Sequence, residues 1–253
     1  MKPGRRPLAL AAALIALGAL AARAQSPGEP RAVVELFTSQ GCSSCPPADA
    51  LVLDLAKNPA LIAITLPVTY WDYLGWKDTL GKDAFAKRQK FYAKARGDGQ
   101  VYTPQIVVNG TAHLVGSDKD EVEKAVRQLP ASGFEARIAL KETAGDLEVE
   151  VKPSATPEDR KAGIWLLQTT RQVTVPITRG ENQGRTLSYA NVVRGMQRIG
   201  DWNGRETRLS VPLAGIRTPD ADGYVVVVQA NLPGKYGIMP GAVLGAARGP
   251  ATP

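Results

Sequence analysis

The sequence predicts an α/β domain followed by a mainly β domain, which makes the chain α+β overall. Residues 31–130 alternate apolar, β-branched runs with runs of helical periodicity. Residues 131–253 instead hold short strand-like runs separated by Gly, Pro and Asn clusters. The length of 253 residues suits one or two domains, and 44% apolar with 22% charged residues is typical of a soluble globular protein.

The first half of the chain predicts a regular order of strands and helices. Apolar runs predict four strands, and helical spacing of apolar residues predicts three helices. Asn109-Gly110 is a hairpin turn signal between two of the strands. The order strand, helix, strand, helix, strand, strand, helix predicts a thioredoxin-like domain over 31–130, built from strands 32–37, 61–68, 105–108 and 112–115 and helices 46–57, 83–95 and 118–129.

The second half predicts strands only. Residues 146–151 alternate apolar and charged side chains, which indicates a sheet with one solvated face. Residues 224–228 are uniformly apolar and predict a strand buried on both faces. Segment 180–202, rich in Asn, Gly and Arg, is assigned to no strand. The mainly β domain over 131–253 is therefore expected to contain strands 135–140, 147–151, 164–173, 207–213 and 224–229.

The N-terminus has the pattern of a secretory signal peptide. Lys2, Arg5 and Arg6 precede an uncharged run over 8–22, and Ala22-Arg23-Ala24 supplies small residues for cleavage after Ala24. The alternative is a membrane anchor, but fifteen residues are fewer than the ~20 that a spanning helix needs. We expect residues 1–24 to be removed, leaving a periplasmic or secreted protein with no stable membrane anchor.

The charge of the chain gives little reason to expect a nucleic-acid partner. The formal net charge is +7, but four basic residues and no acidic ones lie in 1–24, so the mature chain carries only +3. Segment 180–202 is rich in Asn, Gly and Arg but has too little aromatic interleaving and too little net charge to predict nucleic-acid binding. A charge this small does not predict a phosphate-binding surface.

The two cysteines of the chain, Cys42 and Cys45, lie between a predicted strand and the start of a predicted helix. A thiol is nucleophilic only as the thiolate, and unpaired N–H groups at a helix N-terminus stabilise that anion. We expect a Cys42–Cys45 disulfide in which Cys42 exchanges with a partner and Cys45 resolves the mixed disulfide. This role requires a sulfur that a partner can reach.

Three alternatives compete with this redox interpretation. The pair can be a structural disulfide of a non-catalytic binding module, although so small a loop restricts the unfolded chain little. Zinc needs two more ligands, and His113 is the single histidine, so no metal ligand set is expected. A copper(I) carrier with two thiolate ligands stays open as an alternative. No organic cofactor is implied.

Thr103-Pro104 lies 59 positions after Cys45 and precedes a predicted strand. Thioredoxin-like folds place a cis-proline at this point, facing the cysteines, and an X–Pro bond adopts the cis form at little cost. The alternative is an ordinary trans proline at the start of a strand. We predict a cis bond, with Thr103 and Pro104 binding the partner chain beside Cys42.

Two weaker signals lie near these motifs. Glu35, inside the first strand, is either a buried proton relay for Cys45 or an acid that reaches solvent or a salt bridge. Residues 70–76 hold four aromatics, which pack in the core or form a substrate-binding platform that includes Tyr70, Trp71 and Trp76. His113 is expected to be a surface strand residue.

Five motifs together resemble a family of secreted bacterial proteins catalogued as a domain of unknown function. They are VVELFTSQGCSSCPPAD, YWDYLGWKD, VYTPQIVVNG, GRTLSYANVVR and PGAVLGAA. The resemblance covers about 31–247 and implies a thioredoxin-like domain with a β-rich extension, with Cys42, Cys45 and Thr103-Pro104 as its site. Many members carry His-Val-Asp where this chain has residues 67–69, Pro-Val-Thr, which weakens a metal role further. The expected function is thiol-disulfide exchange with protein thiols or disulfides outside the cytoplasm.

Overall fold

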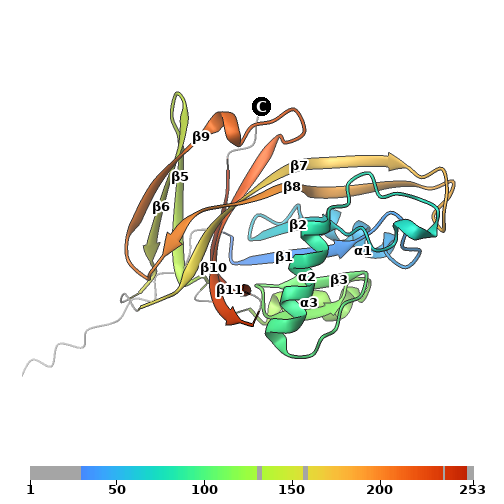
Figure 1. Ribbon diagram of the computed structural model, residues 1–253, viewed down its shortest axis with the longest axis horizontal. Coiled ribbons are helices and arrows are strands. Elements are labelled where there is room, and N and C mark those ends of the chain that lie inside the picture. The colour runs from blue at the N-terminus through green and yellow to red at the C-terminus, as the bar shows by residue number, and fades with distance from the viewer. Residues whose placement is uncertain (1–29, 130–132, 156–158, 236, 250–253) are drawn as a thin grey trace, which may run out of the picture.

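A computed structural model describes residues 30–129, 133–155, 159–235 and 237–249. The described residues form eleven strands and three α-helices. Figure 1 shows the helices gathered at one end of the molecule and a small upright sheet at the other, with two long strands running between them. The expected signal peptide and the expected domain boundary at 130–131 lie outside the described residues.

The elements of the first half agree with the sequence prediction almost residue for residue. The runs 32–38, 61–67 and 105–108 are fully buried as strands, and the run 112–115 is a partly exposed strand. Gly97 (φ +79°) ends the second helix. Asp118 caps the third helix by accepting a hydrogen bond from the N–H of Glu121. In chain order the elements are β1 (Ala32–Thr38), α1 (Pro46–Leu55), β2 (Leu61–Pro67), α2 (Asp83–Arg96), β3 (Gln105–Val108), β4 (Ala112–Val115) and α3 (Lys119–Arg127), with a 3₁₀ turn, η1, at Asp72–Leu74.

The second half contributes seven strands, two of which the sequence analysis does not contain. These two are β8 (Thr186–Trp202) and β11 (Gly237–Arg248). The others correspond to predicted runs, although several are longer than expected. They are β5 (Ala136–Glu142), β6 (Asp146–Pro153), β7 (Ala162–Pro176), β9 (Thr207–Pro212) and β10 (Gly223–Gly234), with a 3₁₀ turn, η2, at Leu213–Gly215.

The predicted fold class, a thioredoxin-like α/β domain followed by a mainly β domain, is wrong. One mixed eight-stranded sheet joins the two halves in the order β11-β10-β7-β8-β2-β1-β3-β4. The remaining strands, β5, β6 and β9, form a three-stranded antiparallel sheet. The unpredicted strand β8 is the physical reason for the correction, because it pairs with β7 on one side and with β2 on the other.

The junction between β2 and β8 is short and is reinforced by side chains. One ladder pair, Thr65 with Val192, joins these parallel strands. The hydroxyl of Thr65 donates to the carbonyl of Ala190 at 2.7 Å, and the amide of Asn191 donates to the carbonyl of Ala63 at 2.8 Å. Asn191 has φ +44°, a left-handed conformation that asparagine tolerates better than most residues. Side-chain donors therefore replace ladder bonds where the strands diverge.

The far edge of the large sheet curls back toward its start. The N–H of Val243 in β11 donates to the carbonyl of Asn109 in the β3–β4 turn at 2.9 Å. Gly110 (φ +74°) follows, and a Cβ there would lie 2.3 Å from the carbonyl oxygen of Gly241. Glycine is required at this turn because it supplies the positive φ and also leaves room for β11.

The curled sheet encloses one hydrophobic core to which both halves contribute. Side chains from β1, β2 and α2 pack with side chains from β7, β8, β10 and β11 in a single buried cluster, which includes Phe37, Ile64, Leu66, Phe85, Leu167, Val193, Val227 and Val243. The opposite face of β1 and β2 packs against α1 and α3. A third cluster fills the space between the small sheet and β7 and β10.

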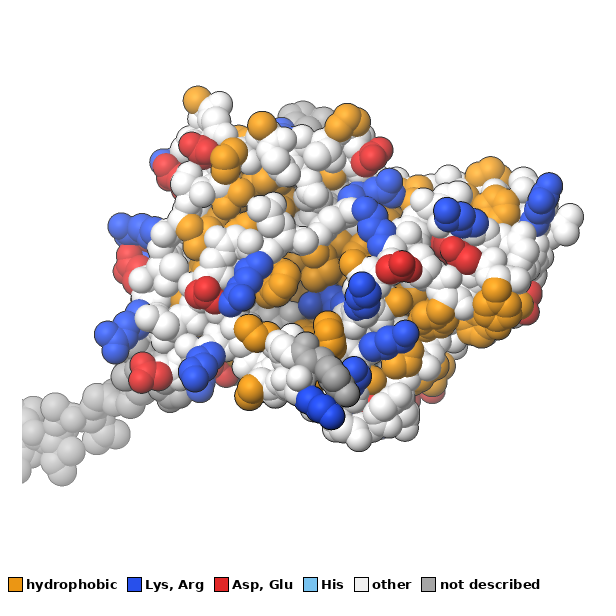
Figure 2. All heavy atoms as spheres, viewed as in Figure 1, with side chains coloured by type: hydrophobic (Ala, Val, Ile, Leu, Met, Phe, Trp, Pro, Cys, Tyr) orange, Lys and Arg blue, Asp and Glu red, His pale blue; other side chains and the backbone are white. Residues whose placement is uncertain are grey.

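The surface carries charges of both signs. On the face in Figure 2, Lys and Arg side chains alternate with Asp and Glu, and hydrophobic side chains gather in a hollow between the part with α2 and the part with the small sheet. Among the described residues, no helix has the length and apolar character needed to cross a bilayer.

Candidate functional site

Cys42 and Cys45 form a disulfide at the junction between the end of β1 and the start of α1. Cys45 is the N-cap of α1, and its carbonyl accepts hydrogen bonds from the N–H groups of Ala48 and Asp49. Cys42 lies one turn earlier, and its carbonyl accepts the N–H of Cys45 at 3.2 Å. The strand therefore delivers both cysteines to the helix start, as their spacing predicts.

The expected source of thiolate stabilisation, unpaired N–H groups of the helix N-terminus, is largely missing. Pro46 and Pro47 occupy the first two helical positions and carry no N–H. The next N–H, from Ala48, is already bonded to the carbonyl of Cys45 at 2.9 Å. Only the helix dipole favours an anion here, so further stabilisation has to come from side chains.

Two hydroxyl groups supply these contacts to Cys42. The hydroxyl of Thr103 donates to Sγ of Cys42 at 3.3 Å, and the hydroxyl of Ser44 lies 3.4 Å from the same sulfur. The indole N–H of Trp71 donates to the Thr103 oxygen at 2.7 Å, which directs the Thr103 proton toward the sulfur. The Thr103-Pro104 peptide bond is cis, which confirms the expected geometry.

The disulfide is buried, contrary to the requirement of a sulfur within reach of a partner. Cys42 is 3% exposed and Cys45 is fully buried, although Ser43 and Ser44 between them are exposed. The turn between β7 and β8 packs against this segment. The side-chain amide of Asn182 donates to the carbonyls of Gln40 and Cys42, each at 2.9 Å. Sequence reasoning missed this contact because it joins residues 140 positions apart.

Two buried carboxyl groups lie close to the cysteine segment. Neither of them was singled out from the sequence. Asp49 accepts a hydrogen bond from the hydroxyl of Thr38 at 2.7 Å, and Asp78 accepts the N–H of Gln40 at 2.8 Å. Burial raises the pKa of both carboxyls, for Asp49 well above its usual range. Among the described residues, the second oxygen of Asp49 and the hydroxyl of Tyr189 have no hydrogen-bond partner.

Glu35 lies on the face of β1 that packs against α2, while α1 covers the other face. Its carboxylate pairs with the guanidinium of Arg88 at 2.7 Å and accepts the hydroxyl proton of Tyr92 at 2.5 Å. The side chain of Gln229, from β10, also donates to the Tyr92 oxygen at 2.7 Å. Of the two alternatives for Glu35, the salt bridge is therefore confirmed.

The aromatic residues after β2 border the site. The rings of Trp71 and Tyr73 stack with centroids 6.2 Å apart, and Tyr73 is 77% exposed. Tyr70 is half-buried and donates to Gln89, and burial raises its pKa to about 12. Trp76 donates its indole N–H to the side-chain oxygen of Gln40 at 2.8 Å. Partly buried Trp71 and exposed Tyr73 thus form an aromatic surface next to Thr103, whereas Trp76 supports the cysteine segment.

His113 lies in the expected strand, β4, where its side chain is partly buried. Its ring nitrogens lie 3.0 Å from the hydroxyl of Tyr102 and 3.2 Å from the carboxylate of Asp98. Burial lowers the pKa of His113. These contacts anchor the loop that leads to Thr103. No cluster of three or more His, Cys, Asp or Glu side chains with metal-binding geometry occurs within the described ranges.

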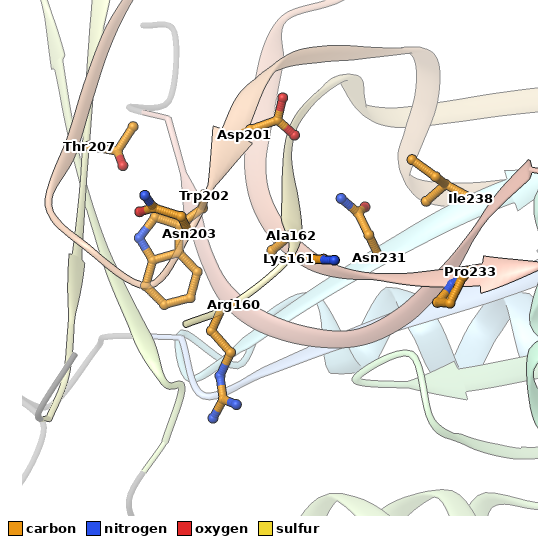
Figure 3. A pocket seen from close by; sticks show the side chains of 10 residues that line it. All are labelled: Arg160, Lys161, Ala162, Asp201, Trp202, Asn203, Thr207, Asn231, Pro233 and Ile238. Atoms are coloured by element: carbon orange, nitrogen blue, oxygen red, sulfur yellow. The ribbon is translucent and has the colours of Figure 1, made fainter. Parts of the chain in front are cut away.

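A separate pocket of about 470 Å³ lies at the far end of β8 (Figure 3). Trp202, the last residue of β8, lines it together with Arg160, Asn203 and Asn231. The disulfide is instead contacted by the turn that enters β8 at Thr186. Because β8 has 17 residues at ~3.3 Å each, up to about 50 Å of strand separates the two places. This pocket is not part of the disulfide site.

Fold and site together define a disulfide-bearing protein with a mixed eight-stranded sheet. The family model described as "Protein of unknown function (DUF1223)" matches residues 33–229, and the chain belongs to this family. The resemblance of the sequence motifs to a family catalogued as a domain of unknown function is thereby confirmed, but the thioredoxin-like character that it implied is not. No curated protein matches the chain.

Two solved structures are similar to the chain. Protein AGR_C_4864 from Agrobacterium tumefaciens is 30% identical, with 87% of this chain and 93% of that chain covered and a TM-score of 0.72. HBP35 of Porphyromonas gingivalis is 13% identical, with 87% of this chain and 74% of that chain covered and a TM-score of 0.57. The second similarity concerns the fold alone.

Proposed function

We propose that this protein is a thiol-disulfide oxidoreductase that exchanges its Cys42–Cys45 disulfide with protein substrates. The observation that carries the proposal is the Thr103 hydroxyl, which donates to Sγ of Cys42 and is itself oriented by Trp71. A hydrogen bond to a sulfur stabilises its thiolate form and lowers its pKa. A disulfide that serves only as a link has no need of such a donor.

The exchange follows from these contacts. A partner thiolate attacks Sγ of Cys42, the Cys42–Cys45 bond breaks, and Cys45 leaves as a thiolate that takes up a proton. A second partner thiolate then attacks the mixed disulfide, which releases the oxidised partner and the Cys42 thiolate. Two electrons pass from the partner to the cysteine pair, and the reverse sequence reduces a partner disulfide. Thr103 and Ser44 stabilise the anion on Cys42 in either direction.

Substrates are proposed to be proteins outside the cytoplasm. The signal-like pattern of 1–24 supports an oxidising compartment, where protein disulfides are common. The stacked pair of partly buried Trp71 and exposed Tyr73, beside Thr103, suits an apolar peptide segment near the reacting sulfur.

Trapping of substrates tests the proposal. In Cys45→Ala the mixed disulfide cannot be resolved, so Cys42 should accumulate adducts with other proteins in the native host. Non-reducing gels and mass spectrometry would detect these adducts, with the Cys42→Ala/Cys45→Ala variant as the matched control. If no adduct forms, and the wild-type protein neither reduces nor oxidises a model disulfide, the proposal is wrong.

Burial of the disulfide supports a second candidate, a binding module with a structural disulfide. Cys42 is 3% exposed and Cys45 is fully buried, and inert structural cysteines are typically buried. This candidate predicts that millimolar dithiothreitol leaves the native protein oxidised while the unfolded protein is reduced. Reduction of the native protein at a rate far above that of global unfolding would exclude it.

A further inference from the structure

We propose that residues 177–185, the turn joining β7 and β8, form a strap that determines which thiols reach the disulfide, with Asn182 as the residue that closes it. The inference rests on the proposed exchange reaction and concerns access to the same site. Its starting point is the discrepancy between a hydrogen-bonded sulfur suited to exchange and a cysteine that is 3% exposed.

The strap is a preformed unit. The N–H of Ile177 bonds to the carbonyl of Arg185 at 2.8 Å, and the N–H of Gly184 bonds to the carbonyl of Ile177 at 2.9 Å. The N–H of Arg185 bonds to the carbonyl of Asn182 at 3.1 Å, which closes the tip. Because these bonds lie within the strap, the shape of the strap does not depend on the cysteine segment. The strap therefore keeps this shape when it is displaced from that segment.

The strap holds the cysteine segment mainly through Asn182. The side chain of Asn182 is 1% exposed, and both donor positions of its amide are used, on the carbonyls of Gln40 and Cys42. A carboxylate oxygen of Glu181 accepts the N–H of Ser43 at 3.2 Å, but this contact is exposed. Ile177 anchors the base of the strap in a small hydrophobic cluster.

Attack on a disulfide requires the incoming sulfur to approach Cys42 along the S–S axis, from the side away from Cys45. Thr103 and Trp71 line one side of the Cys42 segment, and Asn182 fixes its backbone carbonyl on another. Release of the two Asn182 hydrogen bonds would let the strap separate from the cysteine segment. Local opening of this kind costs far less than global unfolding.

This arrangement makes access to the disulfide depend on the size of the attacking thiol compound. A small dithiol needs a small opening, whereas a peptide or protein needs the strap displaced. Each of the two hydrogen bonds of Asn182 favours the closed state over the open state by a factor on the order of a few-fold to tenfold. Their loss should therefore increase the reaction rate of bulky substrates the most. We expect Asn182→Ala to react with a reduced peptide dithiol of about ten residues on the order of tenfold faster than wild type, with a smaller gain for dithiothreitol.

The test measures both rates by acid quench, alkylation and mass spectrometry on the full mature chain. Arg179→Ala, an exposed position of the same strap, is the matched control and should react at wild-type rates. Asn182→Asp keeps the side-chain size but cannot donate to the two carbonyls, so it should also react faster. Circular dichroism and thermal melting verify that each variant is folded.

Unchanged rates for both Asn182 variants would overturn the strap, and equal acceleration of the two probes would overturn its size selectivity. These outcomes are independent of the trapping experiment. Suppose that dithiothreitol reduces Asn182→Ala faster, that Cys45→Ala forms no adduct, and that the wild-type protein neither reduces nor oxidises a model disulfide. This combination would support the strap and refute the proposed function. Adducts of Cys45→Ala combined with unchanged Asn182 rates would do the reverse.

Discussion

Thr103 is the residue on which the chemistry of Cys42 depends most. Two prolines remove the N–H groups that a helix N-terminus would otherwise offer, so the side-chain hydroxyl takes over the role of donor. Trp71 occupies one lone pair of the Thr103 oxygen, which leaves its proton for the sulfur. The sequence motif locates Thr103 correctly, but the indole that orients it follows only from the tertiary structure.

Replacement of Thr103 tests this role. In Thr103→Val the reduced protein should show a Cys42 pKa at least about one unit higher, because a hydrogen bond to a charged group contributes roughly 1.5–3 kcal/mol. The pH dependence of alkylation, followed together with thiolate absorbance, measures that pKa. Thr103→Ser keeps the hydroxyl and should behave like wild type. A Val variant with the wild-type profile would show that the contact is electrostatically unimportant.

The buried carboxyl group of Asp49 should make the free energy of unfolding depend on pH. Burial raises the pKa of its carboxyl in the folded protein, so the folded state binds more protons than the unfolded state. Stability is then highest below the unfolded pKa of about 3.9 and falls as the pH rises toward the folded pKa. Asp49→Asn keeps an acceptor for the hydroxyl of Thr38 but cannot ionise.

The Asn variant should therefore melt at a higher temperature than wild type at about pH 8, with little difference at about pH 4. Asp78, whose pKa burial also raises, remains in both proteins, and its negative charge adds to the raised pKa of Asp49. Calorimetry across this range gives the comparison. A variant that is less stable than wild type at alkaline pH would contradict the assignment of Asp49.

At the scale of elements, sequence periodicity predicted most strands and helices but not β8 and β11. β8 contains Gly195 and Gly200, and its ladder with β7 shifts register twice, so its apolar residues do not alternate regularly. β11 contains Pro240, which is tolerated because β11 is an edge strand. Both strands are stabilised by pairing with neighbouring strands and by the shared core rather than by local propensity. The predicted fold class was wrong because these two strands could not be recognised from the sequence.

The contact between α2 and the large sheet depends on the buried hydroxyl of Tyr92. This hydroxyl donates to Glu35 and accepts from Arg88 and Gln229, which belong to three different elements. We expect Tyr92→Phe to lower the free energy of unfolding by roughly 2–3 kcal/mol, because it leaves buried polar groups unsatisfied. Urea titration at neutral pH measures this. Tyr73→Phe, at a 77% exposed position, should change stability by less than about 0.5 kcal/mol.

At the scale of the whole molecule, the two halves share their largest core. Phe37 and Leu66 from the first half pack in the same cluster as Leu167, Val193 and Val227 from the second. In addition, the ladder between β2 and β8 makes the large sheet continuous. The division near residue 130 that composition suggests is thus a change in sequence pattern along the chain. It does not separate two hydrophobic cores, because residues from both sides pack together.

A fragment containing residues 30–129 alone should therefore fail to fold cooperatively. It would expose the face of β1, β2 and α2 that the second half covers, and it would leave the Tyr92 hydroxyl without Gln229. A compact but loosely packed fragment with this much exposed apolar surface should bind a hydrophobic dye and show no sharp thermal transition, while the mature chain shows one. Cooperative melting of the fragment with native-like near-ultraviolet circular dichroism would instead establish an independent domain over these residues.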